Sequence, residues 1–176
     1  MSRPAPFSAE SYELKALGDP STVVARLVEA TPLAEAIGEL VSGMDPWRRG
    51  GRTAAVMTER FRKTDPSAHR FAVVAPDTVL LGAVIVRHPF MKGPYLETLG
   101  LIAEARRQGI GRAVIDWMAE EVAGEERNLW LCVSRWNAPA RRFYERMGFV
   151  EIGIIPDLAL AGTDEVFMRK TISPAA

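Results

Sequence analysis

Three arginines and two glycines lie together in one short segment of the chain, which reads RRQGIGR over residues 106–112. Its residues are Arg106, Arg107, Gln108, Gly109, Ile110, Gly111 and Arg112. Glycine lets the backbone adopt positive φ and approach a ligand closely. The start of a helix supplies unpaired N–H groups and a positive dipole end, and both favour anions. The segment therefore predicts a turn that binds a phosphate or pyrophosphate group.

Two better-known phosphate motifs are absent from the chain. The dinucleotide motif G-x-G-x-x-G would need glycine where the sequence has Val114, and no G-K-[ST] tripeptide occurs. These absences argue against an enzyme that uses this turn for NADP or ATP.

The predicted elements around the turn form a strand–helix–strand unit. Helices are expected within residues 21–64, and apolar, β-branched segments predict strands over 71–74, 79–86 and 95–101. A helix over 109–123 has one apolar stripe, and a buried strand over 128–134 follows it. A helix capped by Asn137 and two final strands over 150–155 and 165–171 complete the chain. This order predicts an α/β (or α+β) domain with a mixed sheet and a parallel crossover.

A second motif, N-x-x-A-x-x-F-Y-x-x-x-G-F, runs from Asn137 to Phe149. Together with R-x-x-G-x-G from Arg106 and the order of strands, it resembles the GNAT superfamily of acyl-CoA-dependent N-acyltransferases. The resemblance covers about residues 71–172. It implies one domain over residues 1–176, with an acetyl-CoA-binding core 71–172 and the helical region 21–64 on the acceptor side. Residues 1–11 are rich in proline and serine and are expected to be loose. It also implies a central sheet that is splayed at the acyl-CoA site and flanked by helices.

The resemblance assigns the acetyl-CoA contacts to five places. The strand Leu99, Gly100 and Leu101 would pair with the pantetheine arm, as an added strand does. The N–H groups of the 106–112 turn would hold the pyrophosphate. Asn137 would contact the pantetheine arm, and Tyr144 would lie near the thioester sulfur. Arg146 would approach the 3′-phosphate.

The implied chemistry is direct attack of an amine on the thioester through a tetrahedral intermediate. An alkylamine has a pKa near 10.4, so the amine must lose a proton before it attacks. Glu97 is the candidate base, directly or through water, and its alternative is a solvated or salt-bridged strand residue. Tyr144 is the candidate acid for the leaving thiolate, and its alternative is aromatic packing. Gly100 replaces a larger side chain and marks either room for the acceptor or a bulge.

The composition excludes several other classes of protein. Lys and Arg together number 22 and balance 22 Asp and Glu, so no strong field attracts nucleic acid or an anionic membrane. The single Cys132 excludes an internal disulfide, and the two histidines make a metal site improbable. The sequence has no visible secretory signal or membrane-length apolar segment, so a cytoplasmic, soluble protein is expected.

The acceptor is expected to be a small-molecule or peptide amine, without nucleic acid, membrane or metal. The family resemblance also implies that a homodimer is common. A second hypothesis keeps the same fold without the reaction, as a CoA-sensing or protein-binding module.

Overall fold

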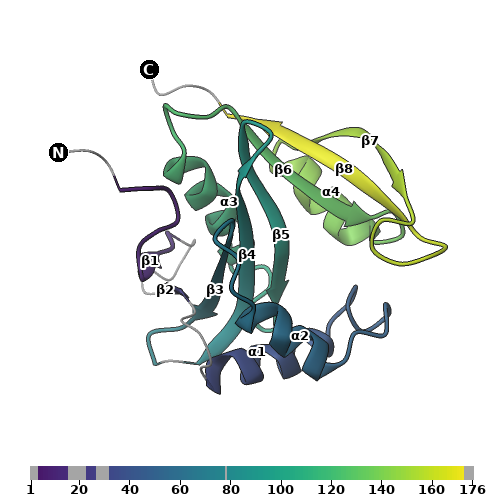
Figure 1. The fold of residues 1–176 in the computed structure, drawn as a ribbon. Coiled ribbons are helices and arrows are strands. Elements are labelled where there is room, and N and C mark those ends of the chain that lie inside the picture. Colours follow the sequence, from purple (N-terminus) through teal and green to yellow (C-terminus); the bar gives the residue numbers. More distant parts are fainter. Residues whose placement is uncertain (1–3, 16–22, 27–31, 78, 173–176) are drawn as a thin grey trace.

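The computed structural model describes residues 4–15, 23–26, 32–77 and 79–172. They form one eight-stranded sheet in the order β1-β2-β3-β4-β5-β6-β8-β7, with four helices (Figure 1). The strands are β1 Ser11–Glu13, β2 Val23–Arg26, β3 Ala68–Val74, β4 Leu80–Phe90, β5 Gly93–Leu101, β6 Asn128–Ser134, β7 Val150–Pro156 and β8 Asp164–Thr171. The helices are α1 Pro32–Ser42, α2 Ala54–Arg62, α3 Ile110–Glu121 and α4 Ala138–Arg146.

The sheet opens between β5 and β6, which are the parallel neighbours in an otherwise antiparallel arrangement. They pair only at Tyr95↔Trp130 and Leu96↔Leu131. Beyond these pairs the two strands diverge (Figure 1). The mixed sheet, predicted from the order of the elements, and its splay, implied by the family resemblance, are therefore confirmed.

A β-bulge lies at the point where β5 leaves β6. Ile85 pairs with Thr98, whereas Val86 pairs with Leu96, so Glu97 is the extra residue of β5. A bulge interrupts the alternation of side chains and re-aims the residue that it inserts. Gly100 pairs regularly with Ala83, so the bulge falls at Glu97 and not at Gly100.

Separate apolar clusters cover the two faces of the sheet. One face packs against α3, whose buried stripe includes Val114, Trp117 and Met118. The other face packs against α1 and α2 through Ile37, Met57 and other apolar residues. The predicted stripe on 109–123 is thus the face of α3 that enters the core.

The N-terminal part of the chain differs from the sequence prediction. Residues 4–11 were expected to be loose, but Phe7 is completely buried and Ser11 begins β1. Residues 21–64 were expected to be helical, but Val23–Arg26 is strand β2, which pairs with β3. Both strands are short and lack a clear alternation of apolar residues, and pairing with the rest of the sheet decides their conformation. Residues 1–3, 21–22 and 27–31 of these two predicted segments lie outside the described residues.

Local signals place α4 as predicted. The Asn137 side-chain oxygen accepts a hydrogen bond from the N–H of Ala140 at 3.3 Å, which caps the helix. Gly148 follows the helix with φ of 89°, a conformation that glycine adopts readily. The two signals fix where α4 begins and ends.

Candidate functional site

The turn before α3 presents a row of backbone donors. Gly109 caps the helix with φ of 81°, and Arg107 has φ of 66°. In the described part of the chain, the N–H groups of residues 107–112 donate to no backbone carbonyl, whereas Ala113 already donates to Gly109 at 2.9 Å. Such unpaired groups at a helix N-terminus form an anion-binding site. This geometry agrees with a pyrophosphate-binding turn.

Side chains hold this turn against the end of β5. Arg106 donates from Nε to the carbonyl of Leu101 at 3.0 Å, and Gln108 donates to the carbonyl of Glu104 at 2.7 Å. Arg112 forms an exposed ion pair with Asp116 at 3.3 Å. Arg106 and Gln108 therefore brace the backbone, while the exposed Arg107 adds positive charge beside it.

Gly111 allows α3 and α4 to approach closely. A Cβ atom on residue 111 would lie 3.1 Å from Cζ of Phe143. This separation is tighter than most real Cβ contacts, so a larger residue would displace the ring or the start of α3. The second glycine of the motif thus has a packing role in addition to exposing the backbone.

Within the part of the chain that the structure describes, one edge of β5 has no strand partner after the bulge. Leu99, Gly100 and Leu101 pair with β4 on one side, but β6 has already diverged on the other. The free edge continues into the 106–112 turn. It can therefore accept an extended ligand along the strand whose anionic end reaches the turn.

α4 brings three further predicted residues to the β6 side of the opening. Asn137 stands three residues after the end of β6, and its side-chain oxygen caps α4. Tyr144 is partly buried, with its ring 5.1 Å from that of Phe143 and 5.7 Å from that of Phe149. Burial raises the pKa of the Tyr144 phenol, which therefore stays protonated at neutral pH. Arg146 is exposed in the last turn of the helix.

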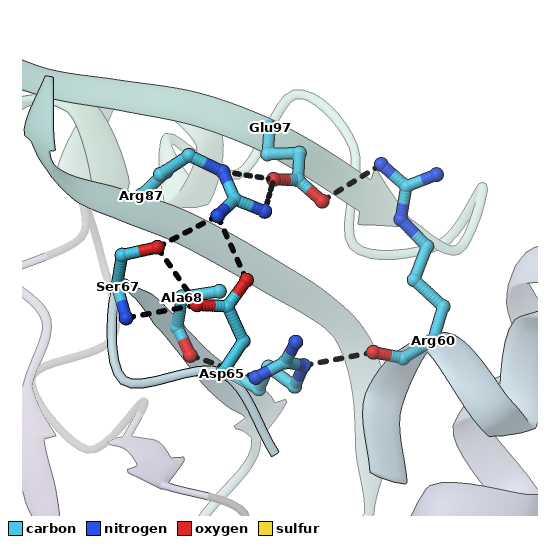
Figure 2. A network of polar contacts seen from close by, with 7 residues as sticks. Arg60, Asp65, Ser67, Ala68, Arg87 and Glu97 are labelled. Atoms are coloured by element: carbon cyan, nitrogen blue, oxygen red, sulfur yellow. Dashed lines mark hydrogen bonds and ion pairs between the residues drawn. The ribbon is translucent and has the colours of Figure 1, made fainter. Parts of the chain in front are cut away.

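Glu97 lies at the centre of a network of polar contacts on the β4–β5 side (Figure 2). Its Oε1 accepts from Nη2 of Arg60 at 2.9 Å, and its Oε2 accepts from Nε of Arg87 at 2.8 Å. Arg87 also donates from Nη1 to Oδ2 of Asp65 at 2.9 Å and to Oγ of Ser67 at 2.8 Å. The network joins α2, β4 and β5 at the bulge.

The network leaves Glu97 ion-paired on both of its oxygens. To act as a base, Glu97 must accept a proton on an oxygen that already accepts a hydrogen bond from an arginine guanidinium. The salt-bridged strand residue considered from the sequence is thus what the structure shows, and a role as base remains a proposal. Donation from Arg87 and Ser67 also holds the pKa of Asp65 well below its ordinary value. The negative charge of Asp65 therefore persists in mildly acidic solution.

Sequence reasoning missed a group of polar residues near the opening, on β5, β6 and β8. Burial raises the pKa values of the Tyr95 phenol on β5 and the Cys132 thiol on β6. Ser134 donates to Oε1 of Glu165 at 2.7 Å, and Glu165 is only 6% exposed. No ion-pair partner of Glu165 is found within the described ranges. The signal that could have revealed Glu165 is its position directly before the apolar residues 166–168 of the final strand, which reads DEVFM from Asp164.

Glu165 should make the stability of the protein depend on pH. Burial raises its pKa in the folded protein, so the folded state binds its proton more tightly than the unfolded state does. Its contribution is fully present below the unfolded pKa and is lost as pH rises through the folded pKa. Glu165→Gln should therefore increase Tm relative to the wild type more at pH 8 than at pH 4, by roughly 2–4 °C for each kcal/mol recovered.

Thermal unfolding across this pH range measures the difference. Glu145→Gln removes an exposed carboxylate and should leave the pH dependence unchanged. Parallel curves for Glu165→Gln and the wild type would show that Glu165 has its ordinary pKa.

Among the described residues, no helix has the length and apolar character needed to cross a membrane. The same residues hold no group of three or more His, Cys, Asp or Glu side chains that could hold a metal ion.

Comparisons with known proteins agree with this geometry. The chain is similar in structure to an aminoglycoside 6'-N-acetyltransferase complexed with coenzyme A, with a TM-score of 0.67, 17% identity and coverage of 87% of this chain and 98% of that one. A spermidine N-acetyltransferase from Vibrio cholerae in complex with CoA and spermine gives a TM-score of 0.62 at 17% identity, covering 86% and 95%. NAA60 from Arabidopsis thaliana in complex with a bisubstrate analogue gives 0.64 at 20% identity, covering 85% and 99%. At these identities the likeness shows a shared fold.

A search of curated proteins finds no match to this chain. The sequence model of the acetyltransferase (GNAT) family, however, matches residues 35–149, which is more than half of the chain. The match includes α1 from residue 35 onward, the free edge of β5, the turn before α3 and the whole of α4. The chain therefore belongs to the GNAT family of acetyltransferases.

Proposed function

We propose that this protein transfers an acetyl group from acetyl-CoA to a primary amine. The observation that carries the proposal is the free edge of β5, which leads directly into the unpaired N–H groups of the turn before α3. An extended pantetheine arm and a pyrophosphate require these two features in this order. The donor sets of the edge and the turn thus fit coenzyme A.

The proposed binding mode uses the residues singled out from the sequence. Leu99, Gly100 and Leu101 would pair with the pantetheine arm, and the 107–112 N–H groups would hold the pyrophosphate. Asn137 has its amide nitrogen available for the arm, because its oxygen already caps α4. The exposed Arg146 would contact the 3′-phosphate.

The reaction makes a C–N bond and breaks the C–S bond of the thioester. The acceptor ammonium first gives up a proton, and Glu97 is proposed to take it through water. A backbone N–H near Leu99 would stabilise the oxyanion of the tetrahedral intermediate. As the intermediate collapses, the Tyr144 phenol would supply a proton to the leaving thiolate. The nitrogen, which gains a positive charge on attack, would release its second proton to water to become the amide, and a proton from water would restore the phenol.

The structural relatives support a small amine as the acceptor. One is an aminoglycoside N-acetyltransferase, and another was solved with CoA and spermine. Both names describe acetyl transfer to amines on small molecules. We propose this class for the present chain also, with peptide amines as the second class to examine.

Thiol release from acetyl-CoA across a panel of amines tests the proposed function. The panel contains polyamines, aminoglycosides, amino acids, and peptides with free N-termini or lysines. Acetyl transfer to any of them supports the proposal and identifies the acceptor class. If CoA binds but no amine in the panel causes thiol release from acetyl-CoA, the result would instead support a CoA-sensing module, in which the ion pairs of Glu97 have a structural role.

Gly111→Val tests the binding turn in the same experiment. A valine side chain would meet the Phe143 ring and cover nearby N–H groups, so CoA affinity should fall at least about tenfold, or 1.4 kcal/mol. Titration calorimetry with CoA measures the change. Gly153→Val is the matched control, because a Cβ there meets nothing within 4 Å. Equal CoA affinity in Gly111→Val and the wild type would remove the turn from the binding site.

A further inference from the structure

Trp47, in the loop of residues 43–53 between α1 and α2, packs directly on the free-edged part of β5. A Cβ atom on Gly100 would lie 3.2 Å from Cζ3 of Trp47 and 3.4 Å from its Cη2. Met44 Sδ would lie 3.5 Å from the same position. The indole ring thus occupies the space that a side chain on residue 100 would take. Gly100 leaves no open space here, because Trp47 from a distant segment fills it.

The same loop also contacts the other side of the splayed sheet. The Arg49 guanidinium lies 4.4 Å from the centre of the Trp136 ring, just beyond β6. Arg52 donates from Nη2 to the carbonyl of Ala159, in the β7–β8 loop, at 3.1 Å. The 43–53 loop therefore bridges from β5 to the segments that follow β6 and β7. Figure 1 shows it reaching from the two helices toward the β7–β8 loop.

Hydrogen bonds within the loop hold this bridge in shape. Arg48 N–H donates to the carbonyl of Met44 at 2.8 Å, and Arg52 N–H donates to that of Trp47 at 3.0 Å. Trp47 itself is partly buried against the cluster beneath α1 and α2. The Trp47 ring therefore forms a fixed wall: it packs against the apolar cluster beneath α1 and α2, and its loop is held by hydrogen bonds and by contacts on both sides of the splayed sheet.

The position of this wall has a consequence for the acceptor. Leu99 and Leu101 point to the α3 face, where the proposed CoA site begins, and Gly100 points to the opposite face. On the proposed function, an amine must reach the thioester from the face that CoA does not occupy. We propose that Trp47, seated on Gly100, sets the width of this approach and restricts the acceptor to a primary amine on an unbranched chain. The inference rests on the proposed function and deepens it.

Two diamines of equal charge and different width test the inference. Butane-1,4-diamine carries its amine on an unbranched chain, whereas trans-cyclohexane-1,4-diamine carries it on a ring carbon. The wild type should prefer the linear diamine. In Trp47→Ala the ratio of kcat/KM for the ring diamine to that for the linear one should rise at least about tenfold, since a pocket contact of this size discriminates by 10- to 200-fold.

A second-site variant distinguishes the effect of losing the Trp47 ring from the effect of a general loosening of the loop. Adding Gly100→Phe to Trp47→Ala places an aromatic ring in the same space from the opposite side, and the ratio should return toward the wild-type value. Trp47→Phe should give an intermediate ratio and serves if Trp47→Ala does not fold. Arg48→Ala is the matched control, because the side chain of this exposed arginine pairs with Asp45 of its own loop and, among the described residues, with no other carboxylate.

Each outcome decides one of the two proposals. An unchanged ratio in folded, active Trp47→Ala or Trp47→Phe overturns the inference alone. A raised ratio that Gly100→Phe fails to lower also overturns it, since loop opening would then explain the change. Absence of acetyl transfer to any amine by the wild type overturns the proposed function and the inference with it.

Discussion

Tyr144→Phe is expected to lower kcat by about 100- to 10,000-fold, the usual contribution of a general acid. The substitution removes one hydroxyl group and keeps the ring that packs between Phe143 and Phe149. CoA affinity and Tm should therefore stay close to the wild-type values. The loss should appear in kcat rather than in the KM for acetyl-CoA.

The protonation state of Tyr144 supports this expectation. Burial raises the pKa of its phenol above the ordinary value near 10, so the proton is present throughout the neutral range. The leaving thiolate of CoA belongs to a class of groups with pKa near 8.5 and needs a proton when the C–S bond breaks. In the proposed binding mode, the neutral Tyr144 phenol would lie beside the sulfur and would supply that proton in every turnover.

Tyr12→Phe is the matched control, because it also deletes one phenol hydroxyl. The Tyr12 hydroxyl accepts a hydrogen bond from the N–H of Ala9 at 3.0 Å, on the β1 side of the sheet. Its removal should leave kcat within about twofold of the wild type. Equal kcat values for Tyr144→Phe and Tyr12→Phe would exclude Tyr144 as the acid and favour protonation by water.

Much of the proposed CoA-binding part was predictable because its signals are local. The glycines before α3, the apolar stripe on α3 and the Asn137 cap each act within a few residues of themselves. The strand β6 has the predicted bounds of 128–134. The family motifs then added the splay between β5 and β6, which no local pattern encodes.

The acceptor side was less predictable because its contacts join distant segments. Glu97 pairs with Arg60, which is 37 residues away, and neither residue type indicates the other in the sequence. Trp47 fills the space above Gly100 across more than 50 positions of the chain. Packing between separate elements decides such pairs, and one sequence carries no local signal for them.

The N-terminal segment shows the same limit most clearly. A short stretch rich in proline and serine has the composition of a loose end, yet Phe7 lies in an aromatic cluster with 0% exposure. Its ring lies 5.3 Å from that of Trp117 and 5.6 Å from that of His88. Phe7 also holds φ of 60°, a left-handed conformation that costs roughly 1–2 kcal/mol. Burying the ring contributes about 1.5–3 kcal/mol and offsets that cost.

Phe7→Ala is accordingly expected to lower the free energy of unfolding by about 3–5 kcal/mol. It would leave a cavity beside Trp117, and the conformational cost at residue 7 would lose its compensation. The backbone N–H of Phe7 donates to Oε2 of Glu121 at 3.0 Å, and the substitution keeps this donor, so the end of α3 loses the contact only where the segment detaches. Urea denaturation of the two proteins measures the difference, with Leu158→Ala, an exposed apolar site, as the control.

The site of cleavage by a protease distinguishes local from global loss. If the N-terminal segment detaches first, Phe7→Ala should become sensitive to limited proteolysis within residues 4–15 while CoA still binds to the turn before α3. Unfolding of the whole domain would instead abolish CoA binding at the same urea concentration. A change below about 1 kcal/mol, as at an exposed position, would show that Phe7 leaves the cluster in solution and that the segment is loose after all.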